Sequence, residues 1–373
     1  MYEICVPLTN RTNYSKLKKI LIFLSSRKNI NLKIVLSSTI LLDKYGSSFK
    51  DIINDGFSID KKIDCILLND SHEAMAKTIA LSQIEHASYF ESIKPDLLLI
   101  VGDRFDMVGP ALSASIMNIP IVHIQGGETS GTIDNTIRDL ITRMSSLHFV
   151  STQKSVINLE NFGIKSNMIF NFGCPAVEYI AELEVGKNFD PKLLKKKFKN
   201  EIFSEKNEKY IIVMIHPDTK NKFDVNMDEV LRVIQRLNIK VFIFYPNVDA
   251  NNNFIISSLN KFRSNKNFIF IKHIPLDGYI HLLAHCSSMV TNSSSGIREA
   301  GSFGIPVFNL GFRQKDRERN KNVIDIGNDY SNFGEKITLH LNKKFPKSNI
   351  YYKKNCSELI TNKICDFLNK KLL

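Results

Sequence analysis

The 373-residue sequence contains no uninterrupted apolar run of about 18 residues, the length that a membrane-spanning helix requires. We therefore expect no membrane span. The first ten residues, MYEICVPLTN, lack a basic segment followed by an apolar one, which predicts that the chain has no secretory signal peptide. The cytoplasm is the expected location.

Cysteine is scarce and scattered. The six cysteines form no CxxC pair, and no group of cysteines and histidines has the spacing of a zinc site. We expect them to be reduced and to lie mostly in the core. Neither a metal nor a cofactor is expected.

Acidic residues are outnumbered by basic ones, and the net charge is +12, much of it in lysine runs such as 195–197. A solvated lysine-rich surface is the simplest interpretation. Nucleic-acid binding is not expected, because no basic stripe is interleaved with aromatic residues. A positive cleft that attracts an anionic diphosphate substrate remains a third interpretation.

Short apolar segments alternate with helical periodicity along the chain. In the first half, strands are predicted at 3–8, 31–38, 96–102, 119–124, 147–152 and 168–173. In the second half, they are predicted at 209–217, 240–246, 267–274, 287–294 and 305–311. Continuous apolar runs separated by helices indicate parallel sheets that are covered on both faces.

The strand–helix pattern pauses near Cys174-Pro175 and restarts near residue 209, after a charged stretch. We therefore predict an α/β protein of two Rossmann-like, doubly wound domains, residues 1–178 and 179–355, with a ligand cleft between them. A C-terminal helix within 356–373 could pack back on the N-terminal domain.

Ligands of such sheets bind beyond the carboxyl ends of the strands. Asp103 and Gln125 each follow a predicted strand, and His216 and the segment 292–296 lie at the ends of two others. A lone histidine is often structural, but this position favours a functional role for His216. One pocket could gather all of these residues.

Two motifs of the second half suit a diphosphate. The small-residue turn NSSSGIREAG (292–301) lets backbone N–H groups approach a phosphate at a helix N-terminus, and Glu299 inside that helix could bind ribose hydroxyls. An ordinary capped loop is equally consistent with it. The three arginines of NLGFRQKDRERN (309–320) could clamp phosphates, or they could be solvated.

The first half carries a group of charged residues. Asp103, Glu128 and Asp134 near Arg138 suit proton transfer beside a substrate whose charge must be balanced. A network of helix caps and salt bridges is the alternative. The basic turn TNRTNYSK (9–16) could supply positive charge beside a diphosphate and couple binding to closure.

Taken together and in order, these motifs resemble the UDP-N-acetylglucosamine 2-epimerases. The matching segments are NRTNYSKL, VGDRFD, HIQGGETSGTID, FGCP, IHPDTK and NSSSGIREAGSFGIPVFNLGFRQ. The resemblance extends from about residue 3 to about residue 327 and is nearest the hydrolysing branch, whose members include bacterial enzymes of sialic and legionaminic acid synthesis. It implies a glycosyltransferase-B-like fold, a UDP-sugar substrate and a homodimer.

The resemblance also implies the chemistry. UDP is eliminated with loss of the C2 proton, a 2-acetamidoglucal forms, and water adds to release an N-acetylmannosamine-type sugar for surface glycan synthesis. The expected catalytic residues are Asp103, Gln125, Glu128, Asp134, Arg138 and His216. The expected substrate- and nucleotide-binding residues are Arg11, Ser15, Lys16, Arg104, His216, Ser293, Ser294, Gly296, Glu299 and Arg313.

Five positions depart from the family pattern. Asn13, Ile40, Gln125, Asn135 and Asp139 stand where the family commonly has Asp, His, Glu, Asp and His. We expect all five near the sugar, where an amide keeps hydrogen bonding but cannot act as a base. Three functions therefore stay open: a hydrolysing epimerase with an altered acid/base set, a glycosyltransferase that kept the donor pocket, and a non-catalytic sugar-nucleotide sensor.

Overall fold

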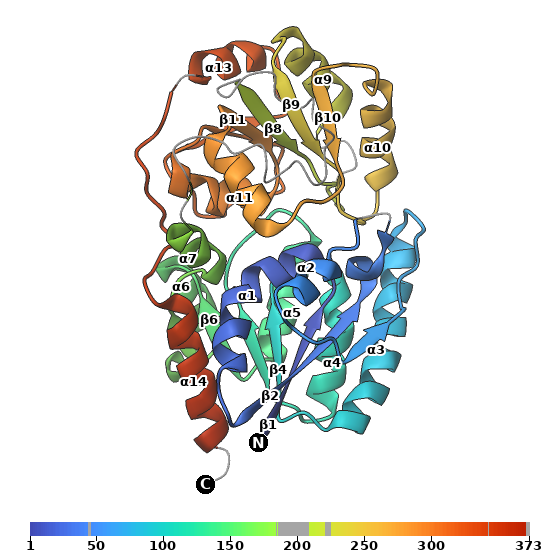
Figure 1. Ribbon diagram of the computed structural model, residues 1–373, viewed down its shortest axis with the longest axis vertical. Coiled ribbons are helices and arrows are strands. Elements are labelled where there is room, and N and C mark those ends of the chain that lie inside the picture. Colours follow the sequence, from blue (N-terminus) through green and yellow to red (C-terminus); the bar gives the residue numbers. More distant parts are fainter. Residues whose placement is uncertain (44–45, 184, 186–208, 221–224, 342, 371–373) are drawn as a thin grey trace. The chain divides into compact units, whose positions relative to one another are not determined.

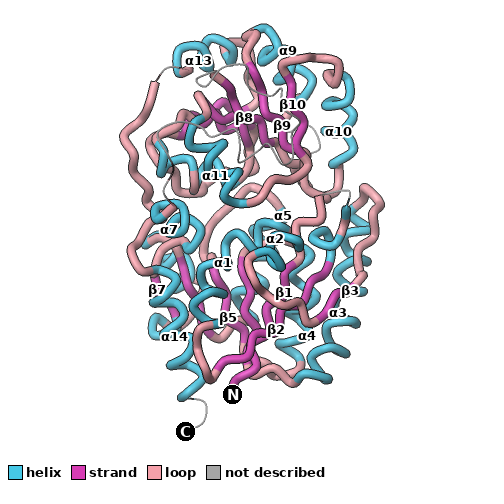
Figure 2. Tube along the Cα trace, in the orientation of Figure 1, coloured by secondary structure: helices cyan, strands magenta, loops and turns pink. Residues whose placement is uncertain are grey.

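The computed structural model describes residues 1–43, 46–183, 185, 209–220, 225–341 and 343–370 (Figures 1 and 2). The chain divides into two compact units. Unit 1 comprises Met1–Thr129, Ile133–Tyr179 and Tyr351–Leu373, and unit 2 comprises Ser130–Thr132 and Ile180–Ile350. In the part of the chain that is described, no helix combines the length and the hydropathy needed to cross a bilayer.

Unit 1 contains a seven-stranded parallel sheet among its described residues, in the order β3-β2-β1-β4-β5-β6-β7. Its strands are β1 (Tyr2–Leu8), β2 (Ile30–Ser37), β3 (Lys61–Ile63), β4 (Leu97–Val101), β5 (Ile121–Ile124), β6 (Leu147–Val150) and β7 (Ile169–Asn171). Its helices are α1 (Arg11–Ser25), α2 (Phe49–Asn54), α3 (His72–Ile93), α4 (Val108–Ile116), α5 (Ile133–Met144), α6 (Gln153–Asn161), α7 (Pro175–Glu182) and α14 (Cys356–Lys370). The strand order reverses between β1 and β4, the point at which such sheets bind ligands.

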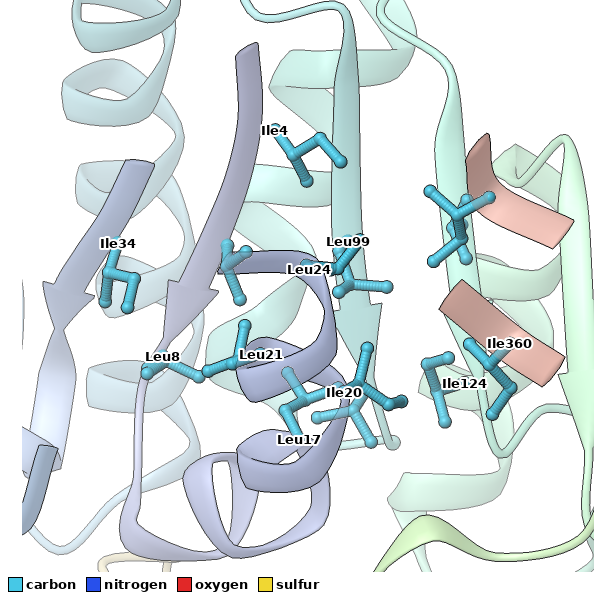
Figure 3. Packing of buried hydrophobic residues seen from close by; sticks show 14 of the residues in the cluster. Ile4, Leu8, Leu17, Ile20, Leu21, Leu24, Ile34, Leu99, Ile124 and Ile360 are labelled. Carbon is cyan, nitrogen blue, oxygen red and sulfur yellow. The ribbon is translucent and has the colours of Figure 1, made fainter. Parts of the chain in front are cut away.

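Helix α1 shows how the sequence covers one face of this sheet. Leu17, Ile20, Leu21 and Leu24 are fully buried and recur with the spacing of one helical face. Figure 3 shows them packed with core residues of the strands and with Ile360 of α14. Each buried leucine or isoleucine stabilises the fold by roughly 2 kcal/mol. A second cluster, which includes residues of α3 and α4, contains the sheet residues Leu98 and Ile100.

Helix α14 belongs to unit 1, although it closes the sequence. The Glu178 carboxylate on α7 is fully buried and accepts hydrogen bonds from the Ser357 N–H (2.9 Å) and hydroxyl. Lys19 on α1 lies 3.2 Å from the other carboxylate oxygen. A carboxylate at the first turn of a helix satisfies its free N–H groups and interacts favourably with its dipole.

Unit 2 contains a six-stranded parallel sheet among its described residues, in the order β10-β9-β8-β11-β12-β13. Its strands are β8 (Tyr210–Met214), β9 (Lys240–Phe244), β10 (Phe268–Ile271), β11 (Ser288–Thr291), β12 (Val307–Leu310) and β13 (Val323–Gly327). Its helices are α9 (Met227–Arg236), α10 (Asn252–Lys261), α11 (Leu276–His285), α12 (Ser294–Arg298) and α13 (Phe333–His340). Two hydrophobic clusters contain alternate residues of β8, as in a sheet covered on both faces.

These two sheets confirm the prediction of two Rossmann-like, parallel-sheet domains, whereas a ligand cleft stays a prediction. The expected charged stretch before residue 209, with its lysine run at 195–197, lies outside the described residues. Helix α1 begins at Arg11, because the Asn10 side chain caps it by accepting from the N–H groups of Thr12 and Asn13.

Candidate functional site

A buried ion pair lies at the carboxyl end of β4 in unit 1. Gly102, with a φ of 89°, turns the chain after β4 and is followed by Asp103. The fully buried Arg138 guanidinium on α5 contacts the Asp103 carboxylate and donates to the Glu128 carbonyl at 2.6 Å. Burial works to lower the pKa of Arg138, but the charges of Asp103 and Glu128 raise it, and the net shift is upward. Arg138 therefore stays cationic and cannot serve as a base.

The other predicted carboxylates lie around the same arginine. Glu128 is buried, and Asp134, in the first turn of α5, also contributes to the raised pKa of Arg138. The structure thus brings together Asp103, Glu128, Asp134 and Arg138, as the sequence suggested. A salt-bridge network was the alternative interpretation of these four residues, and the Asp103–Arg138 contact is such a bridge.

Two of the departing residues form one hydrogen-bonded chain with Arg138. Asn135 accepts from an Arg138 Nη at 3.3 Å through its side-chain oxygen and donates to Asp139 at 2.9 Å through its side-chain nitrogen. Burial raises the pKa of Asp139, although the charge of Arg138 opposes that shift. An amide can link a cation to a carboxylate in this way because it both accepts and donates.

Gln125 does not belong to the hydrogen-bonded chain of Arg138, Asn135 and Asp139. It follows β5 with a φ of 70°, is 1% exposed, and donates from its side-chain nitrogen to the Cys174 sulfur at 3.2 Å. No hydrogen bond found among the described residues joins it to Asp103 or Arg138. Its neutral amide cannot act as a general base there.

The first two turns of α1 carry three residues that were predicted to bind nucleotide. Ser15 donates to the Thr12 carbonyl at 3.0 Å, so its hydroxyl serves its own helix. Arg11 is the first residue of α1 and is half-buried. The Lys16 ammonium nitrogen lies 3.6 Å from the position that a Cβ on Gly102 would take, which places its charge beside the turn that carries Asp103.

The side chain of Ile40 lies in the hydrophobic core, and the expectation that it lies near the sugar stays a prediction. That side chain is 1% exposed and belongs to the hydrophobic core that contains Leu36 and Ile52. Ile40 contributes only its backbone N–H to the polar turn, by donating to the Thr9 carbonyl at 2.9 Å. Ile40 lies in the 3-10 turn Ser38–Leu41 that follows β2. Its branched aliphatic side chain gains more free energy from burial in the core than from exposure to solvent.

A histidine that the sequence analysis did not single out supports the turn at Gly102. His123, inside β5, is within 2.8 Å of the Gly102 carbonyl through Nε2 and within 3.2 Å of the Thr142 hydroxyl through Nδ1. Burial lowers its pKa to about 3, so the ring is neutral and donates from Nε2. A polar residue within an apolar strand was the available sequence signal.

In unit 2, Asn292 joins the ends of β8 and β11. Its side-chain oxygen accepts from the His216 N–H and its side-chain nitrogen donates to the His216 carbonyl, both at 2.8 Å. His216 is 5% exposed, and its Nδ1 accepts from the Asn247 N–H at 3.3 Å. A backbone N–H can only donate, so the Nε2 of His216 carries the ring proton.

The serine-rich turn that follows is short. Ser293 caps α12 by accepting from the Ser295 N–H, and α12 ends at Arg298. Glu299 therefore follows the helix instead of lying one to two turns inside it, as we expected, because the chain tightens into a 3-10 turn at Ala300–Phe303. Ser294, in the first turn of α12, is half-buried.

Gly296 has a packing requirement of its own. A Cβ at this position would lie 2.4 Å from Thr291 Cγ2 and 2.9 Å from Val307 Cγ1. Glycine therefore lets α12 approach the sheet closely, whether or not it also contacts a ligand.

The arginine-rich loop places one of its three guanidinium groups on this turn. Arg313 donates to the Asn292 carbonyl at 3.3 Å. Arg317 donates to the Gln314 side chain at 2.8 Å, and Arg319 lies 3.3 Å from Asp325. Arg317 thus has a partner within the loop and Arg319 has one on β13, and a phosphate clamp stays a prediction.

Comparison with known proteins identifies the family. Residues 23–365 match the family model described as UDP-N-acetylglucosamine 2-epimerase. A UDP-N,N'-diacetylbacillosamine 2-epimerase (hydrolyzing) of Legionella pneumophila is 32% identical, over 91% of this chain and 89% of that protein. A GDP/UDP-N,N'-diacetylbacillosamine 2-epimerase (hydrolyzing) of Campylobacter jejuni is 31% identical, over 87% and 84%.

A solved structure shares the fold. The UDP-GlcNAc 2-epimerase of Neisseria meningitidis, solved with UDP-GlcNAc bound, superposes with a TM-score of 0.80 at 18% identity, over 98% of this chain and 100% of that one. The chain therefore belongs to the UDP-N-acetylglucosamine 2-epimerase family, on its hydrolysing branch.

Proposed function

We propose that the protein is a hydrolysing 2-epimerase whose substrate is a UDP-linked sugar with two acetamido groups, of the N,N'-diacetylbacillosamine type. Two relatives above 30% identity carry that substrate in their names, which supports the choice of sugar. The observation that carries the activity is the buried Asp103–Arg138 pair, with Glu128 and Asp134 around it, at the carboxyl end of β4.

The reaction that we propose consumes one water. A carboxylate removes the C2 proton, the C1–O bond breaks, and UDP leaves with the bonding electrons. Water then adds at C1 while a proton returns to C2 from the opposite face, so that free 2-epimerised sugar and UDP are the products. Gln125 cannot ionise and Arg138 stays cationic, so we assign the proton transfers to Asp103, Glu128 and Asp134.

The turn that follows β11 in unit 2 is proposed to bind the uridine diphosphate. Its support is the group formed by His216, Asn292 and Arg313, together with the backbone of 293–296. A histidine that donates from Nε2 and a serine-rich turn offer neutral hydrogen-bond donors to phosphate oxygens, and the Arg313 guanidinium adds one positive charge. Lys16 and Arg104 are also proposed as cations that bind the anionic substrate.

Incubation in deuterated water tests the proposal. With the diacetamido UDP-sugar, we expect UDP release without any acceptor and a free 2-epimer that carries deuterium at C2. UDP-N-acetylglucosamine, run in parallel, should react more slowly if the second acetamido group is recognised. The Asp103→Asn variant should lose turnover, and the exposed Asp366→Asn variant should keep it.

Two outcomes of this experiment favour other functions. UDP release that requires an added glycan acceptor, without deuterium uptake, would support a glycosyltransferase. UDP binding without turnover under any condition would support a sensor. No observation on the described residues favours either of these over the epimerase.

We further propose a cytoplasmic homodimer. All six cysteines are free thiols, as expected for a reducing compartment. Helix α4 packs against both α3 and α5. These three helices expose large apolar side chains, namely Leu81, Ile84, Ile116 and Leu140. Light scattering should report a dimer, and Ile84→Glu with Ile116→Glu should give a monomer. A monomeric wild-type protein would contradict this proposal.

A further inference from the structure

A second carboxylate, Asp106, lies fully buried close to the turn that carries Asp103. Its two oxygens accept from the Thr9 hydroxyl at 2.9 Å and the Ser38 hydroxyl at 3.1 Å. An Arg104 Nη lies 3.6 Å away. Thr9 and Ser38 follow β1 and β2, and Asp106 and Arg104 follow β4, and these three strands are adjacent in the sheet. One carboxylate thus joins three turns at the ligand-binding edge.

Asn13 and Asp106 both lie within hydrogen-bond distance of the Thr9 hydroxyl. The Asn13 oxygen accepts from the N–H groups of Thr9 and Asn10, and its nitrogen donates to the Val101 carbonyl at 3.3 Å. The same oxygen lies 2.9 Å from the Thr9 hydroxyl oxygen, the distance at which Asp106 also lies. That hydroxyl has one proton, and an ionised carboxylate is the stronger acceptor.

The amide at position 13 therefore leaves Asp106 as the one carboxylate on the Thr9 hydroxyl. A carboxylate at position 13 could not donate to Val101. It would also place a second negative charge beside the same buried hydroxyl, which is costly because like charges in a buried site oppose each other's ionisation. With Asn13 in place of the Asp that the family commonly has, the turn keeps a single, ordered carboxylate.

Arg104 is the residue that this anion holds. Its side chain is buried, and its guanidinium lies 5.5 Å from the Phe105 ring, with Asp106 on its own turn. We propose that Asp106 is a positioning residue that orients Arg104 toward the phosphate groups of the substrate, and that the Asn13 amide leaves Asp106 as the one carboxylate on the Thr9 hydroxyl. This inference rests on the proposed function for the role of Arg104.

A double-mutant cycle with UDP as the probe tests the proposal without turnover. Asp106→Asn, which keeps the shape, should weaken UDP binding by about tenfold, because Arg104 loses the carboxylate that orients it from 3.6 Å away. Arg104→Met should weaken it at least as much. The double variant should bind no more weakly than Arg104→Met alone, because the carboxylate acts through the guanidinium.

Ser38→Ala is the matched control. It removes one hydrogen bond to Asp106 and leaves the pairing with Arg104, so the melting temperature should fall while the UDP dissociation constant stays within about twofold. A purely structural role for Asp106 would instead lower the melting temperature of Asp106→Asn and leave UDP binding unchanged. That result, or effects of Asp106→Asn and Arg104→Met that multiply, would overturn the proposal.

Asn13→Asp tests the second part. It should lower the melting temperature, and adding Asp106→Asn should recover part of the loss by restoring a single carboxylate. If the melting temperature does not change in Asn13→Asp, the role of Asn13 is refuted. A wild-type protein that binds UDP but turns over no UDP-sugar would refute the proposed function, while the binding cycle would still decide the role of Asp106. No UDP binding at all would refute both.

Discussion

The two units carry sheets of the same kind, but the polar groups at their strand ends differ in charge. In unit 1, two buried or partly buried carboxylates each have an arginine beside them: Asp103 pairs with Arg138, and Asp106 lies near Arg104. In unit 2, Asn292 and His216 are joined by neutral hydrogen bonds between side chain and backbone. The difference teaches that the unit 1 site depends on complete charge pairs, whereas the unit 2 site depends on the shape of its turns.

Arg138→Met, at the charged strand ends of unit 1, should lower the free energy of unfolding the most. It leaves the Asp103 carboxylate and the Glu128 carbonyl without their buried cation, and loss of one partner of a buried pair costs about 3–5 kcal/mol. We expect that decrease in the free energy of unfolding, measured with urea, and loss of UDP release. Arg143→Met is the matched control on the same helix, because Arg143 is exposed. Equal stability of the two variants would contradict the comparison.

Acid should weaken unit 1 through three buried histidines. Burial lowers the pKa of His86 and His148 to about 4 and that of His123 to about 3. The unfolded chain therefore binds more protons below pH 6.5, so stability that is present above that pH is lost as the pH falls toward about 4. At pH 5.5 each histidine should cost about 1 kcal/mol.

Urea unfolding at pH 7.5 and pH 5.5 measures this loss, roughly 3 kcal/mol in all. His86→Gln should reduce it by about a third, because glutamine does not titrate but can still donate to the Ser82 carbonyl, which accepts at 2.7 Å from His86. An unchanged dependence on pH in that variant would show that His86 is not one of the responsible groups.

Asn292→Asp should disturb the neutral side of the comparison less. It replaces the donation to the His216 carbonyl with a carboxylate that faces that oxygen, at a cost of about 1–3 kcal/mol. UDP binding should weaken by about tenfold by calorimetry, if the unit 2 turn binds the nucleotide. Asn328→Asp, on an exposed residue of the same unit, should change neither quantity. Unchanged UDP binding in Asn292→Asp would show that the nucleotide does not bind at this turn.

Periodicity allowed much of the fold to be predicted. The strand expected at 96–102 is β4, Leu97–Val101, and its continuous apolar run is buried throughout. The edge strands β3 and β13 were missed because an edge strand needs no continuous apolar run. In β3, Lys61 and Lys62 are exposed, and in β13, Asp325 is exposed.

The site was predictable only in part. Asp103 and Arg138 follow separate strand and helix signals, and the parallel sheet brings them together. The contacts of Asp106 and Ile40 were not predictable, because they depend on which way each side chain leaves its turn. Ile40 points into the core, and Asp106 accepts from residues 68 and 97 positions away in the chain.

The smallest effect should come from Asn135→Asp, and it tests whether two of the departing residues changed together. The variant places two carboxylates at positions i and i+4 of α5 and removes the donation from Asn135 to Asp139. Asp139 is partly solvent-exposed, so screening limits the cost to about 0.5 kcal/mol at neutral pH. The cost should shrink in acid, because protonation of either carboxylate removes the repulsion.

The exchange Asn135→Asp with Asp139→Asn restores one amide and one carboxylate in reversed order. We expect its stability to return to within error of the wild type, whereas Asn135→Asp alone stays destabilised. Turnover measured on the same variants separates the charge pair from the chemistry. If the exchange restores stability but not UDP release, then the carboxylate is needed at position 139 itself. If it restores neither, the two residues are not coupled, and Asn135 acts only through its contact with Arg138.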